Sequence, residues 1–277
     1  MIVFSAITPH PPIIIPEVGK GETKKVKKTI SAMEKLAKDL EEAEPDTIIV
    51  ITPHGLVYPN QMNICGMEKL IGDFSTFGAP EPRMSFKNDL LLADKLDRAG
   101  RKNGVKTILY HNGDRELVLD YGVLVPLYFL TQGLTEIEVL PIAYSYQSRA
   151  EHFSFGEIIA ETCGKSKKRI AIIASGDLSH RLIPSAPAGY NASGKQFDKL
   201  LMNYLKEKDI QGILEMDEGF VEEAGECAYR SILILLGTIE KLDWQPEILS
   251  YEGPFGVGYL VANLKIKEAT ITNLSHE

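Results

Sequence analysis

Short continuous apolar runs alternate with longer amphipathic stretches along most of this sequence. The runs at 2–7, 47–51 and 170–174 are rich in β-branched residues, which is typical of parallel strands buried on both faces. Between the first two runs, residues 22–44 place apolar side chains at helical spacing. Repetition of this pattern predicts an α/β fold with three α/β/α layers around a mostly parallel or mixed central sheet.

The remaining elements follow from the same two periodicities. Further strands are predicted at 62–65, 105–110 and 137–143, and a terminal hairpin with strands at 246–250 and 258–266. Further helices are predicted at 88–102, 154–163 and 193–206, and a long apolar helix is entered at 220–227 and ends near residue 239.

Two segments are predicted from their proline and glycine content. Residues 72–83 are rich in Gly, Pro and polar residues, which predicts a long loop that serves as a lid or substrate wall. From Asp114 to Leu130 a polar loop is predicted to open a buried helix, with Pro126 near the start of that helix.

The sequence Thr-Pro-His occurs twice, each time directly after an apolar run. It appears as Thr8-Pro9-His10 and as Thr52-Pro53-His54, and the proline ends each strand because it has no N–H to donate. A strand, a helix and a strand form a right-handed βαβ unit, so His10 and His54 are expected at one sheet edge, on neighbouring or near-neighbouring strands. Two neutral imidazoles there suit a divalent transition metal. In the alternative interpretation, each histidine only caps a loop.

A third histidine follows the most apolar run. The segment Ser175-Gly176-Asp177-Leu178-Ser179-His180 leaves the strand at 170–174. Its hydroxyl and carboxylate side chains are of the kind that orient an imidazole in a site. In the alternative interpretation, the Asp and Ser side chains only satisfy backbone amides of a turn.

Composition and charge exclude several classes of function. The 277-residue chain has a net charge of −8, which argues against nucleic acid or an anionic membrane as a partner. No apolar run reaches the ~18 residues of a membrane span, and the first residues lack a basic segment, so a cytoplasmic location is expected. Cys65, Cys163 and Cys227 form no CxxC pair, which argues against a disulfide framework or a zinc knuckle.

Taken in order, these motifs resemble a known family. The two Thr-Pro-His segments, Leu119-Asp120-Tyr121-Gly122 with Val125-Pro126-Leu127, the segment ending in His180, and Gly225-Glu226-Cys227 resemble the LigB-type class III extradiol ring-cleavage dioxygenases. The resemblance is closest to the Memo-like branch, whose LigB-like domain accompanies an AMMECR-type protein. It covers nearly the whole chain and implies a LigB-like fold in a single catalytic domain over 1–277.

The resemblance also implies roles for individual residues. His10 and His54, with one carboxylate, would bind non-haem Fe(II), with Zn or Cu as alternatives, and His180 would be the catalytic acid and base. The implied partners are a small aromatic diol and an AMMECR-type protein, and a homodimer is the default assembly.

The sequence departs from the family pattern at two places. At the third-ligand position Glu226 and Cys227 are adjacent, and neighbouring residues on a helix point about 100° apart, so only one of them can face the metal. Glu226 would complete a carboxylate set and Cys227 the Memo-like set, and the sequence leaves this choice open; Glu226 could instead stabilise a helix N-terminus. Tyr121 stands where many family dioxygenases have a histidine that helps to hold oxygen, and a phenol can donate a hydrogen bond but cannot become a cation.

The leading hypothesis is therefore a non-haem Fe(II)-dependent extradiol-type dioxygenase that cleaves a catechol-type ring, with His180 and Tyr121 as catalytic residues. The alternative is a Memo-like metal-binding protein that works with a partner protein and has no dioxygenase activity. A Zn²⁺-dependent hydrolase fits the ligand chemistry but lacks the resemblance. A Ser-His-Asp hydrolase is disfavoured because the sequence has no G-x-S-x-G motif.

Overall fold

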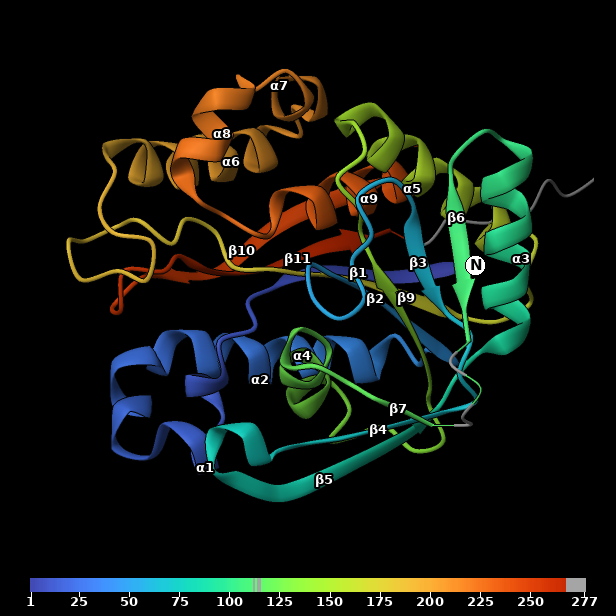
Figure 1. Ribbon diagram of the computed structural model, residues 1–277, viewed down its shortest axis with the longest axis horizontal. Coiled ribbons are helices and arrows are strands. Elements are labelled where there is room, and N and C mark those ends of the chain that lie inside the picture. The colour runs from blue at the N-terminus through green and yellow to red at the C-terminus, as the bar shows by residue number, and fades with distance from the viewer. Residues whose placement is uncertain (112, 114–115, 268–277) are drawn as a thin grey trace, which may run out of the picture.

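The computed structural model describes residues 1–111, 113 and 116–267, and their strands form one mixed sheet (Figure 1). Four parallel strands make its centre, in the order β1 (Ile2–Thr8), β9 (Ile170–Ser175), β2 (Thr47–Thr52) and β8 (Glu138–Ala143). On one side, β11 (Tyr259–Ile266) pairs antiparallel with β1 and with β10 (Trp244–Glu252), as the predicted terminal hairpin requires.

On the other side of the centre, β8 pairs with two groups of strands. β3 (Met62–Cys65) runs antiparallel to β8 and parallel to β6 (Thr107–Tyr110). β5 (Ala79–Lys87) joins β8 through one residue pair and continues the sheet to β4 (Lys69–Phe74) and β7 (Glu116–Val118).

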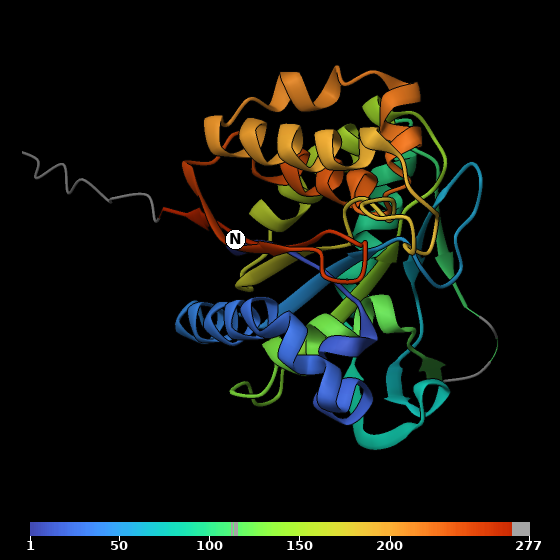
Figure 2. The same ribbon diagram turned by 90° about the vertical axis from the view of Figure 1, so that its left-hand side faces the viewer.

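Helices cover both faces of the sheet (Figures 1 and 2). One face carries α3 (Leu90–Lys102), α5 (Arg149–Gly164) and α9 (Tyr229–Ile239), with α6 (Ala192–Glu207), α7 (Ile210–Leu214) and α8 (Glu218–Ala224) beyond them. The other face carries α1 (Pro16–Gly19), α2 (Lys27–Glu42) and α4 (Tyr121–Leu130), with the short 3₁₀ segments η1 (Pro12–Ile14), η2 (Lys20–Val26) and η3 (Ser75–Phe77).

The central strands separate two hydrophobic cores. Ile49 and Ile51 of β2 belong to the core under α5 and α9, whereas Ile48 and Val50 belong to the core under α2 and α4. Successive side chains of a strand point to opposite faces, so a strand buried on both sides needs a continuous apolar run. This arrangement confirms the predicted three-layer fold.

Three sequence predictions about single elements are wrong. Residues 72–83 are not a long loop, because most of them fall in the end of β4, in η3 and in the start of β5, and β4 pairs antiparallel with β5. Pro80 and Pro82 are accommodated where the register shifts between Gly72 and Phe74 of β4, since a strand tolerates proline at a bulge. Pro126 lies in the middle of α4 rather than near its start; residues 114–115 of that predicted segment lie outside the described residues.

The third wrong prediction is the long helix that ends near residue 239, because this segment forms two helices. Gly225 adopts a φ of +62° after α8, and α9 begins at Tyr229. A positive φ ends a helix and favours glycine. Glu226 and Cys227 therefore lie in a bend between two helices rather than on one helix.

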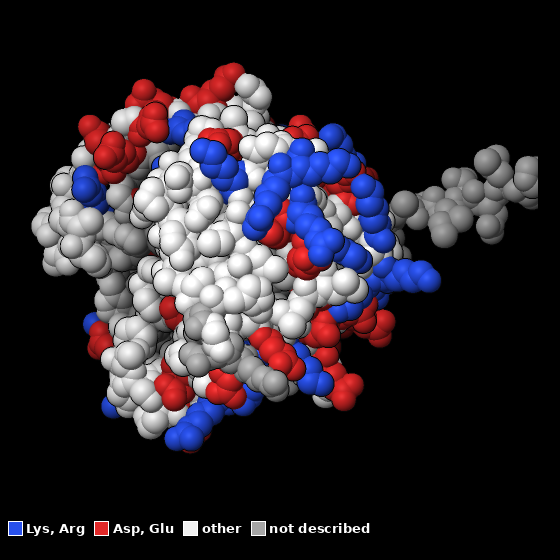
Figure 3. All heavy atoms as spheres, turned by 45° about the vertical axis from the view of Figure 1, so that its right-hand side comes forward, with Lys and Arg blue, Asp and Glu red and all other residues white. Residues whose placement is uncertain are grey.

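Charged side chains of both signs lie on the surface in Figure 3, where Lys and Arg gather on one part of the face with Asp and Glu among them.

In the described part of the chain, no helix has the length and apolar character needed to cross a membrane.

Candidate metal centre

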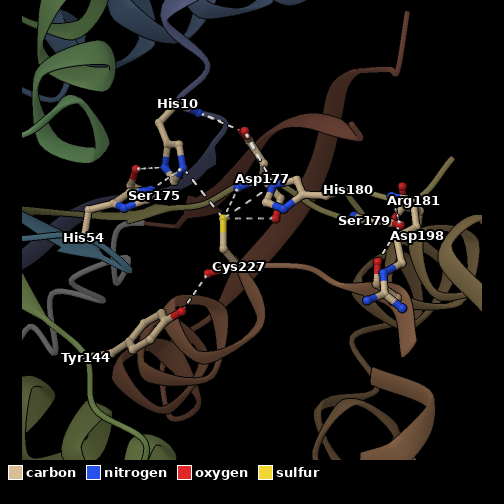
Figure 4. Close-up of polar contacts among 11 residues, drawn as sticks. His10, His54, Tyr144, Ser175, Asp177, Ser179, His180, Arg181, Asp198 and Cys227 are labelled. Atoms are coloured by element: carbon tan, nitrogen blue, oxygen red, sulfur yellow. Dashed lines mark hydrogen bonds and ion pairs between the residues drawn. The ribbon is translucent and has the colours of Figure 1, made fainter. Parts of the chain in front are cut away.

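Three histidines follow three neighbouring parallel strands. β9 lies between β1 and β2, so His10, His180 and His54 leave adjacent strand ends and converge with the thiol of Cys227 (Figure 4). His10 Nε2 lies 3.2 Å from His54 Nε2 and 3.6 Å from Cys227 Sγ. His180 Nε2 lies 3.9 Å from the same sulfur. The near-neighbouring placement predicted for His10 and His54 is confirmed, and the intervening strand supplies His180.

Hydrogen bonds fix the tautomer of His10. The Ser175 hydroxyl donates to the Gly122 carbonyl at 2.5 Å, so its single proton is used there. The contact of 3.0 Å between His10 Nδ1 and Ser175 Oγ therefore has Nδ1–H as donor. The lone pair of Nε2 then faces His54 and Cys227, which is the protonation state that a metal ligand needs.

Asp177, in the segment after β9, holds Cys227 and the backbone of His10 in place. The Asp177 carboxylate accepts the His10 backbone N–H at 3.0 Å, and the Asp177 carbonyl accepts the N–H groups of Cys227 and Ala228, each at 3.1 Å. The Asp177 N–H in turn points at Cys227 Sγ, 3.2 Å away. A Cβ on Gly176 would lie 2.3 Å from the Ala228 Cα, so only glycine lets the start of α9 approach so closely.

Glu226 is not part of this cluster. Its Oε2 accepts the backbone N–H of Tyr229 and so caps the start of α9, the role that the sequence analysis gave as its alternative. Glu226 lines a different cavity, together with Arg149 and Arg230. The bend at Gly225 turns the two adjacent side chains in different directions, and it is the Cys227 side chain that meets the histidines.

Tyr121 packs beside the histidines. Its ring centroid lies 4.4 Å from that of His54 and 5.5 Å from that of His10. Burial, then the nearby Cys227, Asp177 and Asp120, raise the pKa of Tyr121 to about 12. Its phenol therefore stays protonated and keeps a hydrogen-bond donor at neutral pH.

Burial decides the charge of the cluster. Burial lowers the pKa of His54, and burial with the neighbouring histidines lowers the pKa of His10 well below 6.5; burial and His54 likewise lower the pKa of His180. The three imidazoles are therefore neutral at pH 7. Burial also raises the pKa of the Cys227 thiol, with Asp177 and Glu226 adding to the effect, so formation of a metal–thiolate bond there would release a proton.

Two further residues support the site: Thr52, which the sequence analysis named only as part of the second Thr-Pro-His segment, and Tyr144, which it did not name. Thr52 Oγ1 accepts the backbone N–H of His54 at 3.2 Å, and the Tyr144 hydroxyl donates to the Cys227 carbonyl at 3.4 Å. Tyr144 directly follows β8, the strand beside β2. The rule that located the histidines, a polar residue at the carboxyl end of a buried strand, would have found Tyr144 as well.

Two distances within the donor set are close to those expected around a divalent ion. Ligands at ~2.1 Å for nitrogen and ~2.3 Å for sulfur on a tetrahedral ion lie ~3.4 Å apart for two nitrogens and ~3.6 Å apart for nitrogen and sulfur. The observed distances, 3.2 Å between His10 and His54 and 3.6 Å between His10 and Cys227, are close to both values. Among the described residues, no three His, Cys, Asp or Glu side chains form a complete metal-binding group as they stand, so closure around an ion requires side-chain adjustment.

Comparisons with known proteins show that this chain is similar to ring-cleavage dioxygenases. A family model described as the catalytic LigB subunit of aromatic ring-opening dioxygenase matches residues 5–262. The chain is 25% identical over 240 residues to the 2-aminophenol 1,6-dioxygenase beta subunit of a Pseudomonas species, covering 80% of this chain and 76% of that protein. It is 29% identical over 165 residues to a 2,3-dihydroxyphenylpropionate/2,3-dihydroxicinnamic acid 1,2-dioxygenase of Xanthobacter autotrophicus, covering 54% and 49%.

Two further similar proteins carry no activity in their names. A protein of Clostridium acetobutylicum is 38% identical over 264 residues, which is 94% of this chain and 56% of that protein. The chain thus spans about half the length of this relative. An uncharacterized protein of Escherichia coli K12 has a solved structure that matches 95% of this chain and 99% of its own with a TM-score of 0.63 at 16% identity, which shows a shared fold.

Proposed function

We infer the function of this chain from the premise that it belongs to the LigB family, the catalytic subunits of aromatic ring-opening dioxygenases. Dioxygenases of this family generally use Fe(II), and its members act on aromatic diols. We propose that the chain is a metal-dependent enzyme that opens the ring of a catechol-type diol next to the hydroxyl pair. The observation that carries the proposal is the convergence of His10, His54, His180 and Cys227 at three adjacent strand ends.

His10, His54 and Cys227 are the proposed ligands. The Ser175 hydroxyl holds the His10 ring with its Nε2 lone pair toward the cluster, and the Asp177 backbone holds Cys227. We do not propose Glu226 for this role because its carboxylate accepts the Tyr229 N–H at the start of α9. Fe(II) is the expected ion, with Zn or Cu as alternatives, and a thiolate in the set moves the preference towards softer ions.

The bound metal would supply a Lewis acid where the diol and dioxygen meet. His180 is the proposed general base and acid. Its pKa is lowered, so a neutral Nε2 is available to take a proton from a catechol hydroxyl and later to return one. Asp177 Oδ2 lies 4.0 Å from His180 Nε2, where it would stabilise the protonated ring. Tyr121 is the proposed hydrogen-bond donor to the oxygen atoms of the reacting ring.

A second candidate function has a specific observation in its favour. Cys227 rather than a carboxylate meets the histidines, and Tyr121 stands where a histidine would hold oxygen, so the chain could be a Memo-like metal-binding protein without dioxygenase activity. The longer Clostridium relative is consistent with a second module, such as an AMMECR-type partner. Ring cleavage separates the two functions.

The test compares metal content of anaerobically purified wild type with Cys227→Ala and Glu226→Ala, by elemental analysis and X-ray absorption. We expect a sulfur-ligated metal that is lost from Cys227→Ala and kept by Glu226→Ala. Loss of the metal with Glu226 instead, or a protein that binds no metal, would reject the ligand set.

The reaction is tested separately in a screen of catechols with the Fe(II)-loaded protein. We expect His180→Ala to keep its metal and lose at least ~100-fold in ring-cleavage rate, since general acid–base groups contribute about that much. Undiminished turnover in this variant would remove His180 from the mechanism, and metal binding without any turnover in wild type would favour the second candidate.

A further inference from the structure

A cavity of about 210 Å³ adjoins the metal centre, and His54 is part of its wall. The cavity lies at the ends of β2, β3 and β8, beneath β7 and the start of α4. Its apolar lining residues include Leu56, Leu117, Leu119, Val123, Pro141 and Ala143. An apolar cavity of ~150 Å³ is large enough to take up benzene, so this one has room for a ring edge with its substituent.

Four side chains with oxygen atoms interrupt the apolar lining, Thr52, Tyr110, Asn63 and Asp120, and the last two are the ones that bear on specificity. Asn63 is 6% exposed and lines the cavity; its amide nitrogen donates to the Leu56 carbonyl at 2.7 Å, and its Oδ1 has no hydrogen-bond partner among the described residues. A buried acceptor without a partner costs about 1–3 kcal/mol. Because Oδ1 itself has almost no accessible surface, a ligand that brings a donor to this wall would recover that cost through a small turn of the Asn63 amide.

Asp120 is the second acceptor, and it lies beside His54. Its Oδ1 accepts the Gly122 N–H at 2.6 Å as the N-cap of α4. The Cβ position of Gly122 would be 2.8 Å from His54 Cδ2 and 2.9 Å from this carboxylate oxygen, so the carboxylate and the imidazole ring both border Gly122. A molecule held at His54 therefore reaches the Asp120 carboxylate within the same cavity.

We propose that this cavity is a specificity subsite for a ring substituent that ends in an N–H or O–H donor, such as an aminomethyl or hydroxymethyl group. Asn63 and Asp120 are the specificity-determining residues, and the apolar wall receives the carbon atoms of the substituent. A carboxylate substituent is disfavoured because it would meet the Asp120 carboxylate. This inference rests on the proposed function, since it specifies the chemistry of the substituent that an aromatic diol directs away from the metal centre.

The test is a comparison of dissociation constants measured by calorimetry on anaerobic Fe(II)-loaded protein. The probes are 4-ethylcatechol, 4-(aminomethyl)catechol, which has the same number of heavy atoms, and 3,4-dihydroxybenzoate. We expect the amine to bind about tenfold more tightly than the ethyl compound, as one charge-assisted hydrogen bond provides, and the carboxylate to bind more weakly than either. In Asp120→Asn and in Asn63→Leu the preference for the amine should fall to about threefold or less.

Matched controls keep the result specific. Val123→Ala alters the apolar wall and leaves both acceptors, so it should change all three dissociation constants alike. Asp120→Asn retains an N-capping side chain for α4, so it tests the inference even if Asn63→Leu does not fold.

The possible failures are distinguishable. Equal binding of the amine and the ethyl compound, or an amine preference unchanged in Asp120→Asn, overturns the inference and leaves the proposed function standing. Tightest binding of the carboxylate does the same. Absence of binding by all three catechols to a metal-loaded protein overturns the proposed function together with the subsite.

Discussion

The two ends of the central strands both hold buried titratable side chains, but they hold them differently. At the amino end, the Asp89 carboxylate accepts hydrogen bonds from Lys168 Nζ at 2.7 Å, from Thr47 Oγ1 at 2.9 Å and from the Leu92 N–H at 3.0 Å. Burial alone would raise the pKa of Asp89, yet these bonds and the Lys168 charge outweigh it and lower that pKa. The Asp89 carboxylate thus has a cation as its partner, and Lys168 pairs with both Asp89 and Glu138.

At the carboxyl end, burial rather than a charged partner dominates the pKa values of the described groups. Burial lowers the pKa of the three clustered histidines and raises the pKa of Asp177 to about 7, although the His10 N–H opposes the latter. Such an arrangement contributes little stability and keeps lone pairs available. The difference teaches that proximity of ionisable residues alone does not mark a functional site. A functional site is better indicated by a cluster in which burial shifts the pKa values and no charged partner returns them to their ordinary values.

The largest expected effect is on stability at the amino end. Lys168→Met leaves the Asp89 carboxylate, which is 3% exposed, without its cation. We expect a loss of about 3 kcal/mol of unfolding free energy in urea, near the lower limit for breaking a buried pair because Lys168 is itself partly exposed. Lys165→Met, which breaks an exposed pair with Glu161, is the matched control and should cost under about 0.5 kcal/mol. Equal losses would show that the amino end is not held by its charges.

The next effect concerns pH, and its sign is opposite at the two ends. Burial, opposed by bonds from Tyr251 and Ser179, raises the pKa of the Asp198 carboxyl near the carboxyl end to about 6 from an ordinary 3.8. Because the folded-state pKa is raised, this group favours folding below about pH 4, and that contribution, at most about 3 kcal/mol, is lost as pH rises through 6. The pKa of Asp89 is lowered, so its contribution is present above about pH 4 and is lost in acid.

Unfolding free energy measured from about pH 2 to pH 7 checks this contrast. Relative to wild type, Asp198→Asn should gain stability as the pH rises from about 4 to 7. Asp89→Asn should lose stability relative to wild type as the pH rises to about 4, and should change little relative to wild type above that pH. Parallel profiles for the two variants would contradict the assigned pKa directions.

The sequence was sufficient to predict the histidines, because their placement depends on local rules. An apolar run predicts a buried strand, proline ends it, and parallel strands bring their carboxyl ends together. The sequence could not decide between Glu226 and Cys227, because that choice depends on a bend at Gly225 and on the Asp177 carbonyl, which lies 50 residues earlier and accepts the Cys227 N–H. Long-range hydrogen bonds of this kind leave no periodic pattern in a sequence.

The hairpin of β4 and β5 was missed for a related reason. Most residues of β5 are exposed or half-buried, so its apolar signal is weak, and Pro80 and Pro82 suggested a loop. Strands at the margin of a sheet are specified by their neighbours more than by their own composition. The centre of this fold was thus predictable and its margin was not.

The smallest expected effect separates positioning from stability within the carboxyl end. Ser175→Ala removes the acceptor that fixes the His10 tautomer, and loss of such a support typically lowers metal affinity about tenfold or more. Ser5→Ala on the same sheet is the matched control, because the buried Ser5 hydroxyl also donates to a backbone carbonyl, that of Leu264, at 2.6 Å. Both variants should lose about 1–2 kcal/mol of unfolding free energy, whereas metal affinity, titrated with a competing chelator, should fall only in Ser175→Ala. An equal fall in both would mean that affinity follows general stability, and the contrast between the two ends of the sheet would then lose its functional meaning.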